Sequence, residues 1–230
     1  MEILKVKNLN KSFDGKKIID DVSFSVERGL IVGLLGKNGS GKTTVIKMIN
    51  DLLTIDSGEI LIGGEKIGVK TKQKVSYLPE RSYLDTSKKI YQIFDYFEDF
   101  YVDFDRKKAE KMIAELDLTL DMKISKMSKG MREKISLALV MSRNADLYVL
   151  DEPLGGVDPV TRDKILKTIL SNFGENSSLI ITTHLISDVE KILDKVIFID
   201  GGKILLEEDA DKLRESENAS INDIFRRVVK

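Results

Sequence analysis

The sequence contains no cysteine and no tryptophan, and it has one histidine and three prolines in 230 residues. The absence of cysteine excludes disulfide bonds, thiolate nucleophiles and cysteine-ligated metal sites, and it is compatible with a reducing compartment. No apolar run approaches the roughly 20 residues that a membrane-spanning helix needs. Residues 1–7 alternate like a strand and lack the apolar region of a signal peptide, so we expect a soluble, cytoplasmic chain.

An excess of charge of one sign is also absent. The 37 Lys and Arg residues almost balance the 38 Asp and Glu residues, and the formal net charge is −1. Because no long basic block marks a surface for polyanions, we do not expect nucleic acid as a partner. Hydrophobic residues make up 42% of the chain, which is enough to build the core of a large α/β domain.

One glycine-rich segment gives the clearest chemical signal. Residues 36–43 read Gly-Lys-Asn-Gly-Ser-Gly-Lys-Thr and fit the P-loop pattern G-x-x-x-x-G-K-[ST]. The apolar run 30–35 before it predicts a buried parallel strand, and residues 44–50 after it predict a helix. This context disfavours the alternative of a plain surface turn, because backbone N–H groups at a helix N-terminus cradle phosphate oxygens.

The P-loop pattern assigns roles to single residues. Lys42 can reach the β and γ phosphates, and Thr43 can bind a magnesium ion. The expected phosphate-binding residues are Asn38, Gly39, Ser40, Gly41, Lys42, Thr43 and Thr44.

Two carboxylates follow a second apolar run. Residues 147–150 predict a buried strand, and Asp151 and Glu152 come directly after it. A P-loop enzyme needs a second magnesium-holding carboxylate at such a strand end, so Asp151 is the expected metal ligand beside Thr43. Glu152 can polarise the attacking water as a general base or as a positioning group. The alternative, an ordinary polar loop, is disfavoured by the presence of the P-loop.

The single histidine, His184, follows the strand-like run 179–183. It should therefore lie at the sheet edge where α/β proteins bind ligands, within reach of a γ-phosphate. A satisfied polar residue without a catalytic role is the alternative. Together these patterns give Glu152, His184 and Lys42 as the expected catalytic residues.

The remaining pattern predicts an α/β fold, a P-loop NTPase core with a mostly parallel sheet, an N-terminal antiparallel β subdomain and an inserted helical subdomain. We expect one domain over 1–230, with core segments 1–83 and 146–208, a helical subdomain at 84–145 and a helical tail at 209–230. The expected strands are 2–7, 18–26, a Gly-Gly hairpin at 59–68, 75–78, 147–150, 179–182, 196–199 and 203–206. In the tail, Ser220 should cap a helix with an apolar stripe at Ile221, Ile224, Phe225 and Val228.

The order of these segments resembles the nucleotide-binding domain of an ABC transporter over nearly the whole chain. The matching segments are the P-loop, Pro79-Glu80, Met-Ser-Lys-Gly-Met at 127–131, Leu-Asp-Glu-Pro at 150–153, Asp158 and His184. The combined order and spacing are far more specific than any one of these motifs. The resemblance implies ATP and Mg²⁺ as cofactors, a catalytic role for Glu152 and a switch role for His184.

The resemblance also adds residues that the chemistry alone does not reveal. Phe13 stands where an aromatic ring stacks on adenine; the less favoured alternative is a core aromatic. Ser128 and Gly130 match the signature segment, which in the family contacts the γ-phosphate held by a second subunit. Asp158 matches the loop that runs along the interface between the two subunits. Glu80 matches the lid residue near Mg²⁺.

Two departures from the family pattern affect these roles. The signature segment carries Lys129 where the family has glycine and Met131 where it has glutamine, so we expect a working but altered contact, with an added cation near the nucleotide. Glu80 replaces the lid glutamine. A carboxylate can approach Mg²⁺ directly or through water, but it cannot donate a hydrogen bond when ionised.

The partners implied by the resemblance are a second ATP-binding subunit, identical or related, and a separate membrane-embedded subunit that holds this chain at the inner face of the cell membrane. Seven aromatic residues between Tyr91 and Phe104 are expected partly to pack the helical subdomain and partly to edge a groove for that membrane subunit. The details most resemble exporters with ABC-2-type membrane subunits, such as small Gram-positive peptide or drug export systems.

Two alternative functions belong to other classes. One is a soluble ABC ATPase acting on a protein assembly or on the ribosome, and the other is a nucleotide-gated binding module without hydrolysis. The single cassette without cysteine disfavours the first alternative, and Glu152 disfavours the second.

Overall fold

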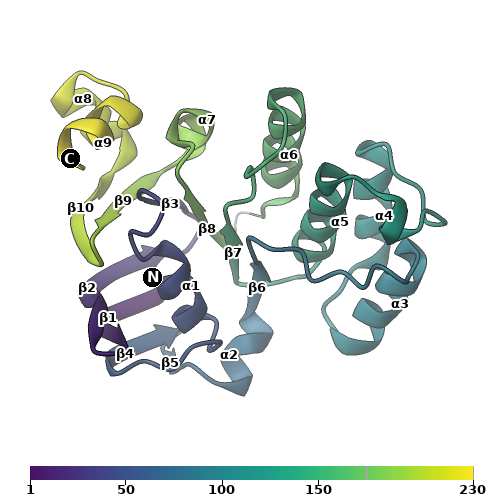
Figure 1. Cartoon of the computed structure of the whole chain (residues 1–230), viewed down its shortest axis with the longest axis horizontal. Coiled ribbons are helices and arrows are strands. Elements are labelled where there is room, and N and C mark those ends of the chain that lie inside the picture. Colours follow the sequence, from purple (N-terminus) through teal and green to yellow (C-terminus); the bar gives the residue numbers. More distant parts are fainter. Residues whose placement is uncertain (175, 230) are drawn as a thin grey trace.

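The computed structural model describes residues 1–174 and 176–229, and Figure 1 shows how the elements are arranged. Glu175 in the expected core and Lys230 in the expected tail lie outside the described residues. Two sheets and a set of helices form the molecule. The antiparallel sheet has the order β2 (Lys16–Glu27), β1 (Glu2–Phe13), β4 (Ser57–Ile62), β5 (Glu65–Lys66). The larger sheet has the order β10 (Lys203–Asp209), β9 (Lys195–Asp200), β3 (Ile31–Leu35), β8 (Ser178–Thr183), β7 (Leu147–Asp151), β6 (Val75–Leu78).

In the larger sheet the five strands β9, β3, β8, β7 and β6 are parallel, and β10 pairs antiparallel with β9. The predicted α/β fold with a mostly parallel sheet and an N-terminal antiparallel sheet is therefore confirmed. The short central strands are buried on both faces because helices and the second sheet cover them, which explains their continuous apolar sequences.

The first strand is longer than its sequence pattern indicates. Alternation predicts a strand over 2–7, but β1 continues to Phe13. Its pairing with β2 shifts register between Val6 and Leu9, where Asn8 adopts a positive φ of 44°. This irregularity changes the phase of the alternation, so the second half of the strand does not continue the pattern of the first. The hairpin predicted at 59–68 is confirmed as β4 and β5.

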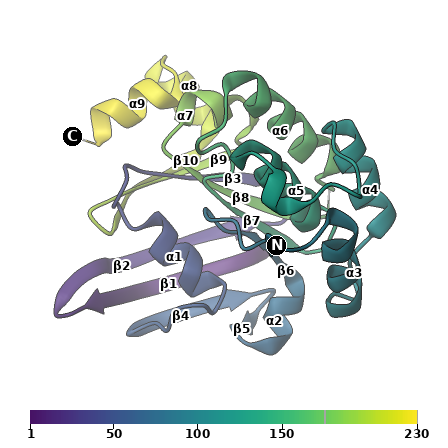
Figure 2. The ribbon, with the colours of Figure 1, turned by 45° about the vertical axis from the view of Figure 1, so that its right-hand side comes forward.

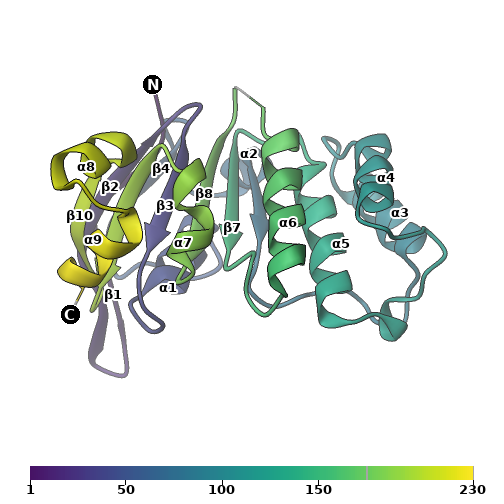
Figure 3. The ribbon, with the colours of Figure 1, turned by 90° about the horizontal axis from the view of Figure 1, so that it is seen from above.

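Helix α1 (Lys42–Ile49) lies between the two sheets, as Figure 2 shows. Its apolar residues join one hydrophobic cluster with the antiparallel sheet and one face of the parallel sheet. Helices on the opposite face bury the other side of the parallel sheet; these are α5 (Lys129–Met141), α6 (Pro159–Asn172), α7 (Ile186–Val189), α8 (Ala210–Glu217) and α9 (Ile221–Val228). Figure 3 shows α6 and α7 alongside the sheet on this face. Ser220 caps α9 as predicted, accepting a hydrogen bond from the Asp223 N–H at 3.1 Å.

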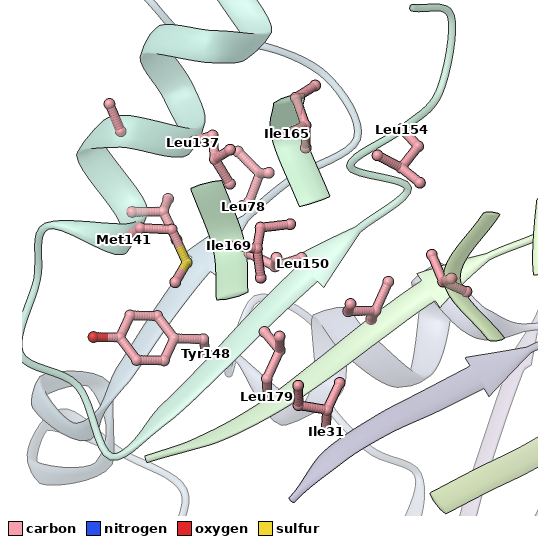
Figure 4. Packing of buried hydrophobic residues seen from close by; sticks show 14 of the residues in the cluster. Ile31, Leu78, Leu137, Met141, Tyr148, Leu150, Leu154, Ile165, Ile169 and Leu179 are labelled. Carbon is pink, nitrogen blue, oxygen red and sulfur yellow. The ribbon is translucent and has the colours of Figure 1, made fainter. Parts of the chain in front are cut away.

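The hydrophobic cluster on the helix-covered face of the parallel sheet supports the strand that precedes Glu152. In Figure 4, Leu150 of β7 and Ile169 of α6 lie together within this cluster, and Leu154 just beyond the strand is also fully buried. Closely packed cores hold their side chains in fixed positions. The segment that carries the two predicted carboxylates is therefore anchored on both sides by buried leucines.

The helical region at one end of the molecule consists of α3 (Ile90–Phe100), α4 (Arg106–Glu115), a short 3₁₀ turn (Ile124–Lys126) and α5, and α2 (Val69–Lys74) precedes β6. Its aromatic residues differ in burial, and Tyr101 is half-buried. Phe94, Phe97 and Phe104 are buried, whereas Tyr91, Tyr96 and Phe100 are exposed. A second short 3₁₀ turn (Glu190–Ile192) follows α7. Among the described residues, none of the helices combines the length and apolar character required to cross a bilayer.

Candidate active site

The P-loop and the predicted catalytic residues meet at one edge of the parallel sheet. The P-loop follows β3, Glu152 follows β7 and His184 follows β8, and these three strands are parallel neighbours whose carboxyl ends lie together. A cavity of about 850 Å³ opens at this edge. Its lining comprises Ile18, Asn38, Gly39, Ser40, Gly41, Lys42, Thr43, Thr44, Glu80, Arg81, Ser82, Lys129, Arg132, Glu133, Glu152, Gly155, Gly156 and His184.

Two glycines allow the P-loop to take its shape. Gly41 immediately precedes α1 and adopts φ +109°, a conformation that L side chains rarely adopt. Gly36 has no space for a side chain, because a Cβ there would collide with the carbonyl oxygen of Ile199 and the hydroxyl of Ser40. The glycine pattern in the sequence is therefore required by the backbone geometry of the loop.

The amino group of Lys42 is buried inside the loop. Its Nζ donates to the carbonyl oxygens of Gly36 at 2.8 Å and Lys37 at 3.2 Å. The same Nζ lies 3.3 Å from Oε1 of Glu152. An ammonium group has three protons, and these three acceptors can take all of them. Lys42 is thus held at the cavity wall, with Glu152 as its one carboxylate partner in the described contacts.

Glu152 also contacts the single histidine. Its Oε2 lies 2.9 Å from Nδ1 of His184, and the His184 backbone N–H approaches the same oxygen at 3.4 Å. Glu152 has a positive φ of 51°, unusual for a residue with a side chain. Its N–H is fixed by the carbonyl oxygen of Thr182 at 3.0 Å and by the Thr182 hydroxyl at 3.1 Å. Strain of this kind, about 1–3 kcal/mol, is typical of functional positions.

Asp151 is almost completely buried at the end of β7. Its Oδ1 accepts hydrogen bonds from the hydroxyls of Thr182 at 2.5 Å and Thr43 at 3.4 Å. Burial raises the pKa of the Asp151 carboxyl; the two threonine hydrogen bonds oppose this effect, and the nearby charges of Glu80 and Glu152 add to it. A cation beside this group would favour its ionised form.

The neighbouring oxygens of Thr43 and Asp151 fit a magnesium ion. Mg²⁺ prefers hard oxygen ligands and usually takes one or two protein carboxylates, with substrate phosphates and waters completing its shell. Among the described residues, no group of three or more His, Asp or Glu side chains forms a metal cluster by itself. Glu80 lines the same cavity and remains a predicted third contact.

Besides the buried metal ligand Asp151, four predicted binding residues do not line this cavity. Ser128 caps α5, accepting from the Met131 N–H at 3.2 Å, and Asp158 caps α6, accepting from the Thr161 N–H at 3.0 Å. The hydroxyl of Thr161 and then its N–H lower the pKa of Asp158. Phe13 is 45% exposed at the end of β1, and Gly130 lies in the first turn of α5. Roles of these four residues in nucleotide binding stay predictions.

The cavity is also lined by charged and polar residues that sequence reasoning did not assign. Arg81 and Ser82 follow Glu80 directly, and Arg132 and Glu133 lie one turn after Ser128 on α5. Burial raises the pKa of Glu133, whose Oε1 lies 3.6 Å from Nζ of Lys129. The i, i+4 spacing of Lys129 and Glu133 could have predicted that both face the cavity, because side chains four residues apart lie on one face of a helix.

Comparison with known proteins gives consistent matches. The family described as ABC transporter matches residues 19–155. The ABC transporter ATP-binding protein YtrB of Bacillus subtilis (strain 168) is 32% identical over 216 residues, covering 93% of this chain and 74% of that protein. The linearmycin resistance ATP-binding protein LnrL of the same organism is 32% identical over 211 residues, covering 88% and 68%. A solved ATP-binding subunit of an ABC transporter superposes with a TM-score of 0.87 at 25% identity, covering 99% of this chain and all of that one.

Proposed function

The chain belongs to the ABC transporter family, as an ATP-binding subunit of an exporter-type system, and from this premise we propose that it closes with a second ATP-binding subunit around two Mg-ATP molecules to drive export. ABC ATP-binding proteins are ATPases coupled to transport, and they work with membrane transporter subunits. The proposal concerns how this chain performs that work, which residues carry the reaction and what is exported.

The observation that carries the proposal is the position of the Glu152 carboxylate. One of its oxygens lies 3.3 Å from Nζ of Lys42 and the other lies 2.9 Å from Nδ1 of His184, at the wall of the cavity that the P-loop lines. A carboxylate between a phosphate-binding lysine and a histidine suits a group that accepts a proton from a water attacking the γ-phosphorus.

In the proposed reaction, the water oxygen bonds to the γ-phosphorus and the bond between that phosphorus and the β–γ bridging oxygen breaks. The proton of the water passes to Glu152, and ADP and inorganic phosphate are the products. Lys42 stabilises the phosphate charge and must then turn from Glu152 toward the nucleotide, because its three protons already have acceptors. His184 orients the Glu152 carboxylate through Nδ1, and with both ring nitrogens protonated it can also donate to the γ-phosphate from Nε2.

We assign the magnesium contacts to the Thr43 hydroxyl and the Asp151 carboxylate, with Glu80 as a further contact. When bound, the ion supplies charge neutralisation on the phosphate oxygens. The protein's own part is to hold the two oxygens in place, which the hydrogen bond from Thr182 to Asp151 does at 2.5 Å.

The second ATP-binding subunit is assigned to the surface around the signature segment. Ser128, Gly130 and Asp158 lie outside the chain's own cavity, at the starts of α5 and α6. Helix N-termini attract phosphate charge, so the start of α5 is suited to the nucleotide held by the other subunit. Phe13, exposed beyond the cavity, is proposed as the adenine-stacking ring.

The membrane subunit is assigned to a groove of about 490 Å³ between the parallel sheet and the helical region. Its lining includes Leu52, Tyr83 and Phe100, three large apolar side chains that are exposed. An apolar, aromatic groove suits a short amphipathic helix from a partner. Docking there would hold the chain at the inner face of the membrane. The cargo is proposed to be a drug or peptide, in keeping with the name of the linearmycin resistance relative.

The test of catalysis is the Glu152→Gln variant, which keeps the size of the side chain and removes the proton acceptor. We expect ATP turnover to fall by at least about 100-fold while ATP binding persists, and we expect a dimer by light scattering in ATP and Mg²⁺. The parent chain in the same buffer is the control for folding and binding. Turnover at the parent's rate would remove Glu152 from the role of base, and a monomer at all concentrations would remove the proposed dimer.

The test of partnership is co-purification of tagged Glu152→Gln chain from native membranes in mild detergent. A polytopic membrane protein in near-stoichiometric amount is expected, and Phe100→Ala should reduce its recovery. Leu205→Ala is the matched control, because Leu205 is an exposed leucine on β10, away from the groove. Recovery of soluble assemblies or ribosomes alone would favour a soluble ABC ATPase instead.

A further inference from the structure

Three residues that each carry an unpartnered polar atom line one small cavity next to the active site. Within the described residues, four buried side-chain oxygens have no hydrogen-bond partner. Three of these belong to residues that line a single cavity of about 20 Å³: Oε2 of Glu133, Oγ of Ser136 and Oδ2 of Asp151. Buried polar groups in folded proteins are almost always paired, so three of them around one space indicate a shared partner.

The size and chemistry of the cavity identify that partner. A cavity needs roughly 10–15 Å³ to hold one water molecule, together with two to four polar partners. One water can donate its two protons to the carboxylates of Glu133 and Asp151 and accept the proton of the Ser136 hydroxyl. We propose that this cavity is the binding site of one ordered water molecule that bridges helix α5 to Asp151.

Other occupants fit the site less well. The two carboxylates do not bond to each other directly, since neither oxygen has a partner. A magnesium ion needs six ligands, and a cavity of about 20 Å³ has no room for the waters that would have to complete its shell beside three protein oxygens. Lys129 does not take the place of the water, because its Nζ approaches the other oxygen of Glu133, Oε1, at 3.6 Å.

The bridging water would give Asp151 a second point of attachment. Oδ1 of this carboxylate is held by Thr182 of the sheet and Thr43 of α1. Oδ2 would be held through the water by Ser136 and Glu133 of α5, the helix that begins with the signature segment. Ser136 is then a positioning residue that acts on Asp151 through the water. This inference rests on the proposed role of Asp151, and it makes the carboxylate sensitive to where α5 lies.

The direct test is a high-resolution crystal structure of the parent chain. We expect one solvent peak within about 2.6–3.2 Å of all three oxygens, with the distances of hydrogen bonds. Absence of a peak, or a peak with the short distances and higher ligand number of a metal ion, would overturn the proposal. This readout does not depend on ATP turnover, so it stands apart from the test of the Glu152 role.

The functional test uses Ser136→Val, which places methyl groups where the hydroxyl and the water would lie. We expect kcat to fall about tenfold while KM for ATP changes by less than about twofold, because a displaced carboxylate affects positioning more than binding. The crystal structure of this variant should lack the solvent peak. An unchanged kcat, or a peak that persists in the variant, would contradict the positioning role.

The matched control is Ser76→Ala. Ser76 is a buried serine on β6 whose Oγ already donates to the carbonyl oxygen of Val140 on α5 at 2.8 Å. It therefore also links a strand to α5, but through a direct bond and away from Asp151. We expect this variant to lower the melting temperature and to leave kcat within about twofold of the parent. If kcat falls equally in the two variants, Ser136 has only a structural role and the proposed positioning of Asp151 is contradicted.

Discussion

The amino group of Lys42 and the carboxylate of Glu152 form a buried ion pair of 3.3 Å, with side chains 5% and 9% exposed. The two residues come from different strand ends, one after β3 and one after β7. A γ-phosphate bound in the P-loop would compete with Glu152 for Lys42. The Lys42 ammonium group therefore links the phosphate-binding loop to the proposed catalytic carboxylate of Glu152.

Replacing Lys42 by alanine should weaken ATP binding by about 10- to 100-fold, because hydrogen bonds to charged groups contribute about 1.5–3 kcal/mol. Binding of a fluorescent ATP analogue measures this effect. Lys47→Ala is the control, since Lys47 is an exposed lysine of the same helix and does not line the cavity. Equal affinities in the two variants would contradict the phosphate contact of Lys42.

Replacing His184 by alanine should lower kcat by about 100-fold, because Glu152 would lose the group that orients one of its oxygens. ATP affinity should change by less than about twofold, since Lys42 and the P-loop remain. His184→Gln should recover part of the turnover, because an amide can still donate to Glu152. Steady-state kinetics with parallel binding measurements would decide. A loss confined to affinity would argue against an orienting role.

The ion pair between Arg162 and Asp188 should also influence turnover. Arg162 donates to the carbonyl oxygen of Val157 at 3.1 Å and to Asp188 at 2.8 Å, so it joins the loop after Glu152 to α7 after His184. Arg162→Gln is expected to lower kcat about tenfold with ATP affinity unchanged. Arg28→Gln is the control, because Arg28 likewise contacts a carboxylate and a carbonyl, of Asp146 and Asn176. Matching kcat values for both variants would refute the prediction.

Two glycines with nearly the same φ should respond differently to alanine. Gly15 (φ +78°) has open space at the Cβ position, whereas a Cβ on Gly202 (φ +77°) would collide with the backbone of Ile18. Gly15→Ala should cost about 1 kcal/mol of backbone strain. Gly202→Ala should cost about 2–4 kcal/mol, because overpacking adds about 1–3 kcal/mol. Urea unfolding measures both values.

The Gly202 variant should also weaken ATP binding. The N–H of Gly202 donates to the carbonyl oxygen of Ser40 in the P-loop at 3.0 Å, so a displaced backbone at Gly202 moves the loop. Gly15→Ala, at the β1–β2 turn, should bind ATP like the parent. If the two variants lose the same free energy of unfolding, the backbone near Ile18 must move aside without loss of stability, which would contradict the predicted difference.

Removing the buried cation of Arg143 should destabilise the chain more than removing the exposed cation of Arg28. Its buried guanidinium binds both oxygens of Asp103 at 3.0–3.2 Å and donates to the carbonyl oxygens of Val75 and Gln73. Arg143→Met should destabilise the chain by about 3 kcal/mol, because Asp103 would lose its partner in a partly buried place. Arg28→Met, which breaks an exposed pair, should cost less than about 1 kcal/mol. Thermal and urea unfolding would test the contrast.

Sequence patterns anticipated the chemistry more completely than the geometry. The P-loop spacing, the apolar runs before Asp151 and His184, and the cap at Ser220 each depend on neighbours in the chain, so local rules identify them. The second half of β1 and the charged wall formed by Arg81, Arg132 and Glu133 were not anticipated. The register shift in β1 breaks the alternation of its sequence, so the second half of the strand cannot be predicted from that pattern. Arg81, Arg132 and Glu133 line the cavity only when the helical region packs near the P-loop.

The class of fold, the phosphate-binding loop and the two carboxylates follow from the amino-acid sequence alone, because glycine patterns and short apolar runs encode backbone shape and strand burial directly. The position of Glu152 between Lys42 and His184, and the cavity that Glu133, Ser136 and Asp151 help to line, arise only when the chain is folded. These contacts join residues far apart in the chain. Their distances follow from how parallel strands and helices pack, which no local pattern specifies.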